Sequence, residues 1–273
     1  VASLRAGARL TTEQLAIAAG SHHGTGEQVA VVRSTLESAG LREEDLGCPP
    51  ALPADPTALR AAAATGPDTA SPDGPEPRRI WHNCSGKHAG MLAACAASGW
   101  DTASYLQARH PYQEVVREVI AGSLGTVHAT TTDGCGAPIH AISVRELAGG
   151  YARLFWGHPH GVEVAGAMAA HPVLVGGHAA DDTRLMQLLP GLVAKRGAEG
   201  VFAVSAPGAG AVVVKVSDGA MRPAVMVALR LLALLGVDTS PAGALAHAAV
   251  MGGGLPVGSV EPSLALLAAV QGE

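Results

Sequence analysis

The chain has 273 residues, 48% hydrophobic and 15% charged, which suits one globular domain spanning 1–273 with a sizeable core. Its formal charge is −5 with histidine neutral, and the basic residues are scattered singly, which argues against nucleic acid or an anionic membrane as a partner. No stretch approaches about 18 uninterrupted apolar residues, and the start carries no signal pattern, so we expect a cytoplasmic protein that acts on a small molecule.

Two helices are predicted near the start of the chain. Thr11 and Gln14 have the spacing of a capping box, and the helix that follows them is expected to end at Gly20. A second helix is predicted over 27–39, because its apolar residues recur on one face. Ser21 is therefore expected just beyond the end of the first helix.

A loop and a third helix are predicted next. Residues 65–77 are rich in proline and glycine and cannot hold regular structure, so they should form a flexible loop. Asn83 or Ser85 can cap a helix that runs toward Gly99. This capping places residues 83–88 around a helix N-terminus.

The second half of the chain mixes strands with helices. Residues 127–132 are β-branched and lead into a glycine-rich turn, and the strands 201–205 and 211–216 are joined by a second such turn. Helices are predicted over 144–156, 160–170, 181–195 and from about Arg222. The expected fold class is α/β of the α+β kind, an antiparallel sheet packed by helices with a helical lobe around the cleft.

The segment 83–88, Asn-Cys-Ser-Gly-Lys-His, concentrates reactive side chains at the predicted helix start. A helix N-terminus favours the thiolate of Cys84 and disfavours the ammonium of Lys87. Both changes would make better metal ligands or nucleophiles, since a ligand must donate a free lone pair. A buried cysteine beside a solvated lysine explains the same spacing equally well.

Asp133 and Cys135 lie in the tight turn after the strand at 127–132. Together with Cys84 and Lys87 they could complete a four-ligand zinc shell, although the spacing matches no short zinc-finger pattern. On spacing alone, simple burial of Cys135 is favoured. Four cysteines in a chain of this length are too few for a disulfide scaffold, which leaves metal binding or burial.

Ser21 and Lys215 have unusual surroundings in the sequence. Ser21 precedes two histidines, but adjacent side chains rarely face each other, so an ordinary loop serine is the commoner case. Lys215 lies in an apolar strand, where a lysine is costly unless it reaches an edge, a cleft or an acidic partner. An outward-facing strand residue is the alternative for Lys215.

Four segments, in this order, are familiar in combination: 13–22, 83–91, 132–138 and 195–201. The most specific elements are Cys-Ser-Gly-Lys-His at 84–88 and Asp-Gly-Cys-Gly-Ala-Pro at 133–138. Together the segments resemble the bacterial L-asparaginase II family, the zinc-containing, serine-lysine type. The resemblance covers nearly the whole chain.

The resemblance implies a fold similar to serine β-lactamases and penicillin-binding proteins, and hydrolysis of L-asparagine to L-aspartate and ammonia. By resemblance, Ser21 and Lys215 would form the second serine-lysine pair of the active site. Zinc would be the cofactor, and its ligands by resemblance are Cys84, Lys87, Asp133 and Cys135. L-Asparagine is then the small-molecule partner, and a homodimer remains open.

The family also carries a Ser-x-x-Lys element, its nucleophile and base, upstream of the region that begins here at Val1. No Ser-x-x-Lys occurs in this chain. We therefore expect an N-terminally truncated chain with negligible activity, either a fragment of a full enzyme or a truncated relative. Two alternatives are a non-catalytic zinc-stabilised amino-acid-binding domain and a cysteine-dependent amidohydrolase in which Cys84 or Cys135 attacks with help from His88.

Overall fold

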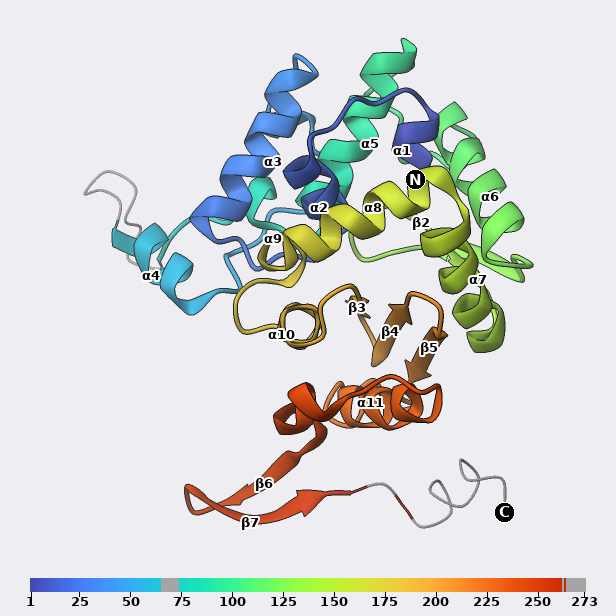
Figure 1. Ribbon diagram of the computed structural model, residues 1–273. Helices are drawn as coiled ribbons and strands as arrows, with labels where there is room; N and C mark the ends of the chain where they lie inside the picture. Colours follow the sequence, from blue (N-terminus) through green and yellow to red (C-terminus); the bar gives the residue numbers. More distant parts are fainter. Residues whose placement is uncertain (65–73, 262, 264–273) are drawn as a thin grey trace.

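The computed structural model describes residues 1–64, 74–261 and 263 of the chain (Figure 1). Helices predominate, and the strands form three small antiparallel sheets, so the predicted α+β class is confirmed. Of the predicted loop 65–77, residues 65–73 lie outside the described part. Within the described part, no helix has the length and apolar character needed to cross a bilayer.

The upper half of the molecule in Figure 1 is a lobe of helices. Its centre consists of α2 (Thr12–Ala18), α3 (Gly26–Ser38), α5 (Ser85–Ser98) and α8 (Pro159–Ala170), and α2 contacts the other three. Around them lie α1 (Ala2–Arg5), α4 (Pro56–Ala64), α6 (Pro111–Ser123), α7 (Val144–Gly157) and α9 (Pro172–Gly176).

Capping side chains fix where the first two long helices begin. The predicted capping box is confirmed, since Thr11 accepts a hydrogen bond from the N–H of Gln14 at 3.3 Å and its own N–H donates to the Gln14 side chain at 3.0 Å. Thr25 and Gln28 repeat the motif at the start of α3. These caps satisfy N–H groups that have no partner within the helix.

The start of α5 differs from its prediction. Neither Asn83 nor Ser85 caps the helix, because the N-cap is Cys84, which makes no capping hydrogen bond with its side chain. The hydroxyl of Ser85 instead donates to the carbonyl of Ile80 at 2.9 Å. The predicted end is confirmed, with Gly99 in the left-handed conformation at φ 66°.

The central sheet lies below the helical lobe and has the strand order β3-β4-β5 (Figure 1). The predicted hairpin is confirmed by β4 (Val201–Ala206) and β5 (Gly210–Lys215), which pair antiparallel. The predicted helix 181–195 is only half right, because α10 ends early (Asp181–Leu188) and β3 (Val193–Gly197) follows it. Pro190 and Gly191, the latter with φ 89°, separate the two elements.

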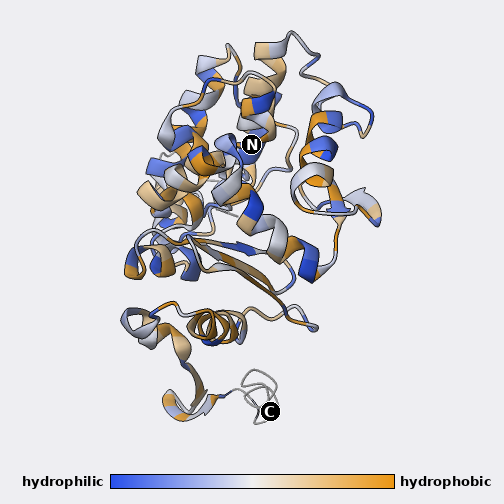
Figure 2. Ribbon diagram, turned by 45° about the vertical axis from the view of Figure 1, so that its right-hand side comes forward, coloured by the Kyte–Doolittle hydropathy of each residue, from blue (hydrophilic) through white to orange (hydrophobic). Residues whose placement is uncertain are grey.

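Helices cover the central sheet. Both α7 and α11 (Ala224–Leu234) contact β4 and β5, and α11 lies beneath the sheet in the view of Figure 1. Figure 2 shows α11 as predominantly hydrophobic, in agreement with its buried residues such as Leu229 and Leu232. Burial of this apolar surface holds the lower layer on the sheet.

Two further hairpins complete the described structure. The first joins β1 (Ala129–Thr132) to β2 (Pro138–Ala141), and its turn holds residues 133–137 as the sequence predicts. Gly136 adopts φ 87°, a value that favours glycine, and its N–H donates to the carbonyl of Asp133 at 2.9 Å. The second, unpredicted hairpin joins β6 (Ala248–Gly252) to β7 (Leu255–Val260) at the bottom of Figure 1.

Candidate functional site

Ser21 follows directly after α2, where the sequence places it. Its N–H donates to the carbonyl of Val175 at 2.8 Å, which ties the segment to the end of α9. Gly20 allows this approach, because a Cβ atom there would lie 2.7 Å from the same carbonyl oxygen. The backbone at the half-buried Ser21 is therefore held against the end of α9.

Lys195 is the lysine that reaches Ser21. From β3 its Nζ donates to Ser21 Oγ at 2.8 Å and also to the carbonyl of Arg196. Burial lowers the pKa of Lys195 to about 8, against the opposing effect of Asp182 and with a smaller contribution from Arg196. A lysine with a pKa of about 8 is in its neutral, proton-accepting form in roughly one tenth of molecules at pH 7.

Asp182 and Arg196 hold β3 in place beside Ser21. The fully buried carboxylate of Asp182 accepts hydrogen bonds from the N–H groups of Arg196 and Thr183, both at 3.1 Å. The guanidinium of Arg196 contacts Nε2 of His23, and the pKa of His23 is lowered, first by burial and then by the charge of Arg196. These contacts join α10, β3 and the segment after α2.

His22 links the Ser21 segment to the second cluster. Its Nε2 lies 2.7 Å from Ser85 Oγ and its Nδ1 accepts from the N–H of Gly24 at 3.1 Å. Burial lowers the pKa of His22 to about 3, so the ring is neutral. Within the described residues neither His22 nor His23 hydrogen-bonds to Ser21. This absence agrees with the expectation that side chains at adjacent positions rarely face each other.

Lys215 is not brought to Ser21. It lies exposed at the end of β5, opposite Val201, and its Nζ donates to the carbonyl of Val216 at 2.6 Å. This corresponds to the outward-facing alternative rather than to a lysine confined in a cleft. Lys195 was not among the predicted site residues, because its segment was assigned to a helix. Pro190 and Gly191, followed by three apolar residues, are the signal in the sequence that a new element begins there.

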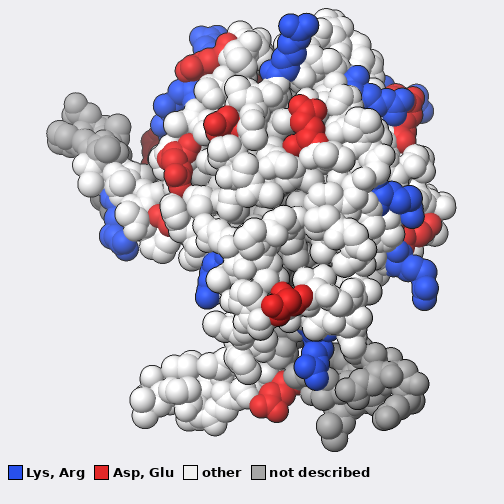
Figure 3. Space-filling view, viewed as in Figure 1, with Lys and Arg blue, Asp and Glu red and all other residues white. Residues whose placement is uncertain are grey.

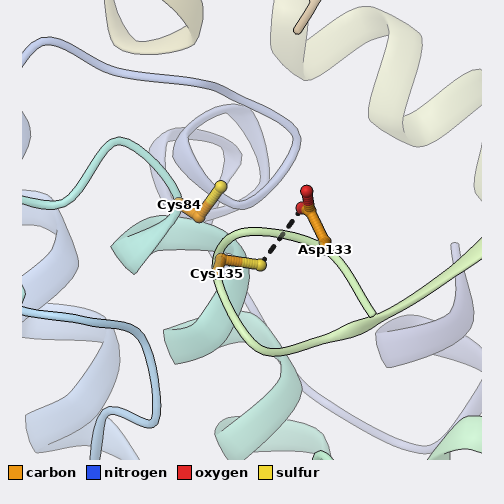
Figure 4. Close-up of side chains that lie close together, drawn as sticks. All are labelled: Cys84, Asp133 and Cys135. Atoms are coloured by element: carbon orange, nitrogen blue, oxygen red, sulfur yellow. Dashed lines mark hydrogen bonds between the residues drawn. The ribbon is translucent and has the colours of Figure 1, made fainter. Parts of the chain in front are cut away.

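The second cluster forms where the start of α5 meets the turn between β1 and β2. Cys84 Sγ, a carboxylate oxygen of Asp133 and Cys135 Sγ lie within 4.8 Å of one another (Figure 4). Cys135 Sγ is 3.2 Å from Asp133 Oδ2, and Lys87 Nζ lies 3.2 Å from Cys135 Sγ and 3.5 Å from Asp133 Oδ2. The structure thus brings together the four residues that the sequence grouped.

Charge is distributed in this cluster differently from the sequence-based expectation. The contact between the two sulfurs raises the pKa of Cys84 and lowers that of Cys135, so Cys135 is the more easily ionised of the two thiols. Burial alone would lower the pKa of Lys87, but Cys84, Cys135 and Asp133 together raise it. The direction of each shift therefore follows from the neighbouring side chains and from burial.

The donor set fits a tetrahedral zinc ion. Zinc binds sulfur, nitrogen and oxygen at about 2.0–2.3 Å, so its tetrahedral ligands lie about 3.3–3.8 Å from one another. The separations of 3.2 and 3.5 Å from Lys87 Nζ are close to this range, and all three other donors lie within 4.8 Å. Two sulfurs are typical of zinc rather than magnesium or calcium, which prefer oxygen.

Charged side chains are otherwise dispersed over the surface. Figure 3 shows basic and acidic groups interspersed over the face in view, with wide uncharged areas between them. Most of the ion pairs are exposed, such as Arg5 with Glu118 and Arg117 with Glu114. This distribution offers no basic stripe on that face for a nucleic acid backbone.

Comparison with known proteins agrees with the geometry. No curated protein matches the chain significantly. A family model described as L-asparaginase II matches residues 1–262. This range includes Ser21, Lys195 and the second cluster, called the thiol cluster from here on, which consists of Cys84, Lys87, Asp133 and Cys135. Its members are associated with asparagine hydrolysis in general. The chain therefore belongs to the L-asparaginase II family.

Proposed function

We propose that the protein hydrolyses L-asparagine to L-aspartate and ammonia, with Ser21 and Lys195 as a serine–lysine pair. The observation that carries this proposal is the 2.8 Å hydrogen bond from Lys195 Nζ to Ser21 Oγ. Lys195 thereby takes the role that the family resemblance had given to Lys215. The lowered pKa of Lys195, caused chiefly by burial, supports a base that can accept a proton near neutral pH.

The pair would activate a hydroxyl for attack on the side-chain amide. Neutral Lys195 accepts the Ser21 proton, and the same ammonium later returns a proton to the departing nitrogen, so that ammonia leaves. The attacking oxygen is Ser21 Oγ itself or the serine of the Ser-x-x-Lys element that the resemblance implies, with Ser21 relaying its proton. Attack gives an aspartyl ester, which water then hydrolyses to L-aspartate.

We propose zinc as the metal of the second cluster, held by Cys84, Lys87, Asp133 and Cys135. When bound, it supplies a Lewis acid near the substrate or a structural link between α5 and the β1–β2 turn. Lys87 has to give up its proton to serve as a ligand, since only a neutral amine donates a lone pair. All four cysteines are free thiols, which supports a reducing, cytoplasmic location.

The buried environment of Cys135 favours a ligand over a nucleophile. Its side chain is 2% exposed and contacts both Lys87 and Asp133, so little room is left for a substrate carbonyl. Iodoacetamide separates the two roles. Inactivation that substrate prevents, in a protein without metal, would instead favour the cysteine-dependent mechanism.

The proposed function is tested by ammonia release from L-asparagine. The assay compares this chain with a form extended upstream, in frame, through a Ser-x-x-Lys element. In whichever form turns over L-asparagine, we expect Ser21→Ala to abolish most of the activity. Equal turnover by both forms would make Ser21 the nucleophile, and tight asparagine binding without turnover in either form would refute the enzyme and favour the binding domain.

A further inference from the structure

A chain of hydrogen bonds that is buried at Tyr105 and His88 runs behind the thiol cluster and has no part in the proposed reaction. The N–H of Gly47 donates to the hydroxyl of Tyr105 at 2.8 Å, and that hydroxyl lies 2.5 Å from Nδ1 of His88. Tyr105 is 2% exposed and His88 is fully buried, with their rings in an edge-to-face contact. A buried polar chain of this kind requires every proton to have an acceptor.

The hydrogen bonds assign the tautomer of His88. Because the Tyr105 oxygen accepts from Gly47, its own proton needs an acceptor, and Nδ1 of His88 is the one within reach among the described residues. Nδ1 is then unprotonated, and a neutral ring carries its proton on Nε2. His88 Nε2 is buried and has no conventional hydrogen-bond partner in the described structure.

The surroundings of His88 direct that N–H toward the thiol cluster. His88 lies one helical turn after Cys84 and directly after Lys87, whose Nζ is 3.2 Å from Cys135 Sγ. The Cys135 turn packs beside the same loop, since a Cβ atom at Gly136 would lie 3.8 Å from the carbonyl oxygen of Gly47. From this position the side chain of His88 interacts with that of Cys135.

We infer that His88 is a positioning residue of the metal centre, with its Nε2–H donating to Cys135 sulfur and Tyr105 fixing the tautomer. This inference rests on the proposed zinc site. A hydrogen bond to a thiolate orients the ligand and withdraws electron density from the sulfur. His88 would thus adjust both the metal affinity and the thiolate-to-metal charge transfer without touching the metal.

The test measures metal binding by the full chain and three variants, without any assay of activity. His88→Leu removes the donor, and His88→Gln keeps an amide N–H near the position of Nε2. Tyr105→Phe keeps the aromatic ring at position 105 but removes the hydroxyl that fixes the tautomer of His88. Each protein is stripped with a chelator and checked by circular dichroism. Zn²⁺ affinity is then measured by competition with a chromophoric chelator, and the sulfur-to-cobalt charge-transfer band is recorded with Co²⁺.

We expect His88→Leu to weaken Zn²⁺ binding by about 10–100-fold and to shift the charge-transfer band to lower energy. His88→Gln should restore most of both properties, and Tyr105→Phe should fall between. Unchanged affinity and spectrum in His88→Leu, or equal losses in the Leu and Gln variants without a band shift, would overturn the inference. If His88→Leu does not fold, unchanged Zn²⁺ affinity and an unchanged Co²⁺ spectrum in Tyr105→Phe overturn the inference. Failure of the unaltered chain to bind either metal refutes the zinc site itself.

Discussion

Lys195 and Lys87 are both withdrawn from solvent, yet their pKa values move in opposite directions. Around Lys195, burial outweighs a single carboxylate, Asp182, and Arg196 adds a like charge, so the pKa falls to about 8. Around Lys87, Cys84, Cys135 and Asp133 outweigh burial, so the pKa rises. Burial alone therefore does not set the charge of a lysine, because the neighbouring groups decide the sign of the pKa shift.

The two settings suit two different tasks. Lys195 can exchange a proton with the Ser21 hydroxyl near neutral pH, as a base must. Lys87 instead balances the negative charge of Cys135 and Asp133, and releases its proton only when a metal replaces that charge. Packing of α2 on α5 joins the segment of Ser21 to the helix that carries Lys87.

The largest expected effect separates Lys195 from Lys215. In an active form of the protein, Lys195→Met should lower turnover of L-asparagine by about 10²–10⁴-fold, because the proton acceptor is lost. Lys215→Met is the matched control and should stay close to the unaltered protein, since Lys215 is exposed and its Nζ hydrogen-bonds, among the described residues, to a backbone carbonyl. If steady-state kinetics show a large loss of turnover in Lys215→Met and little loss in Lys195→Met, Lys215 and not Lys195 is the lysine that pairs with Ser21.

The second prediction concerns metal content. We expect about one zinc per chain, and its loss in both Cys84→Ala and Cys135→Ala together with a lower melting temperature. Cys95→Ala is the control, because Cys95 is also buried on α5 but lies outside the cluster. If elemental analysis finds zinc retained in both cluster variants, Lys87 and its neighbours do not form a metal site.

The third prediction concerns the contact that joins the two regions. A Cβ atom at Gly86 would lie 2.4 Å from the carbonyl oxygen of Ile17, so Gly86→Ala should force α2 and α5 apart. We expect it to reduce the free energy of unfolding by about 1–3 kcal/mol. Gly166→Ala, in open space on α8, should be neutral or stabilise by up to about 1 kcal/mol, and equal effects in denaturant unfolding would rule out the close approach.

Local signals predicted much of this structure. The Thr11–Gln14 capping box, the turn around Gly136 and the β4–β5 hairpin depend on neighbours in the sequence, and all three are confirmed. Cys84 and Cys135 were grouped as possible zinc ligands from their donor chemistry, without a spacing pattern to support the grouping, and the family resemblance implied the same set. Their separation along the chain means that only the packing of α5 against the β1–β2 turn brings them together.

The error in the second half of the chain concerns the strand β3. Residues 192–197 read as the end of a helix, whereas β3 exists because β4 supplies its hydrogen-bond partners. Strand pairing of this kind is tertiary and is poorly encoded in local preference. Lys215 was assigned from the family resemblance and from its place in an apolar strand, whereas Lys195 was placed in a helix and was never weighed as a strand residue facing Ser21.

The most direct test of the Ser21–Lys195 pair is the pKa of Lys195 itself. The chain has only three lysines, so NMR of protein labelled at lysine Cε and Nζ gives three signals, and Lys→Arg variants assign them. We expect the Lys195 signal to titrate near pH 8 and, in protein stripped of metal, the Lys87 signal to titrate above its usual range. Turnover should rise as the pH passes through 8, because neutral Lys195 is the active form. A Lys195 signal that titrates at or above the usual lysine value of about 10.4 would contradict a base at this position.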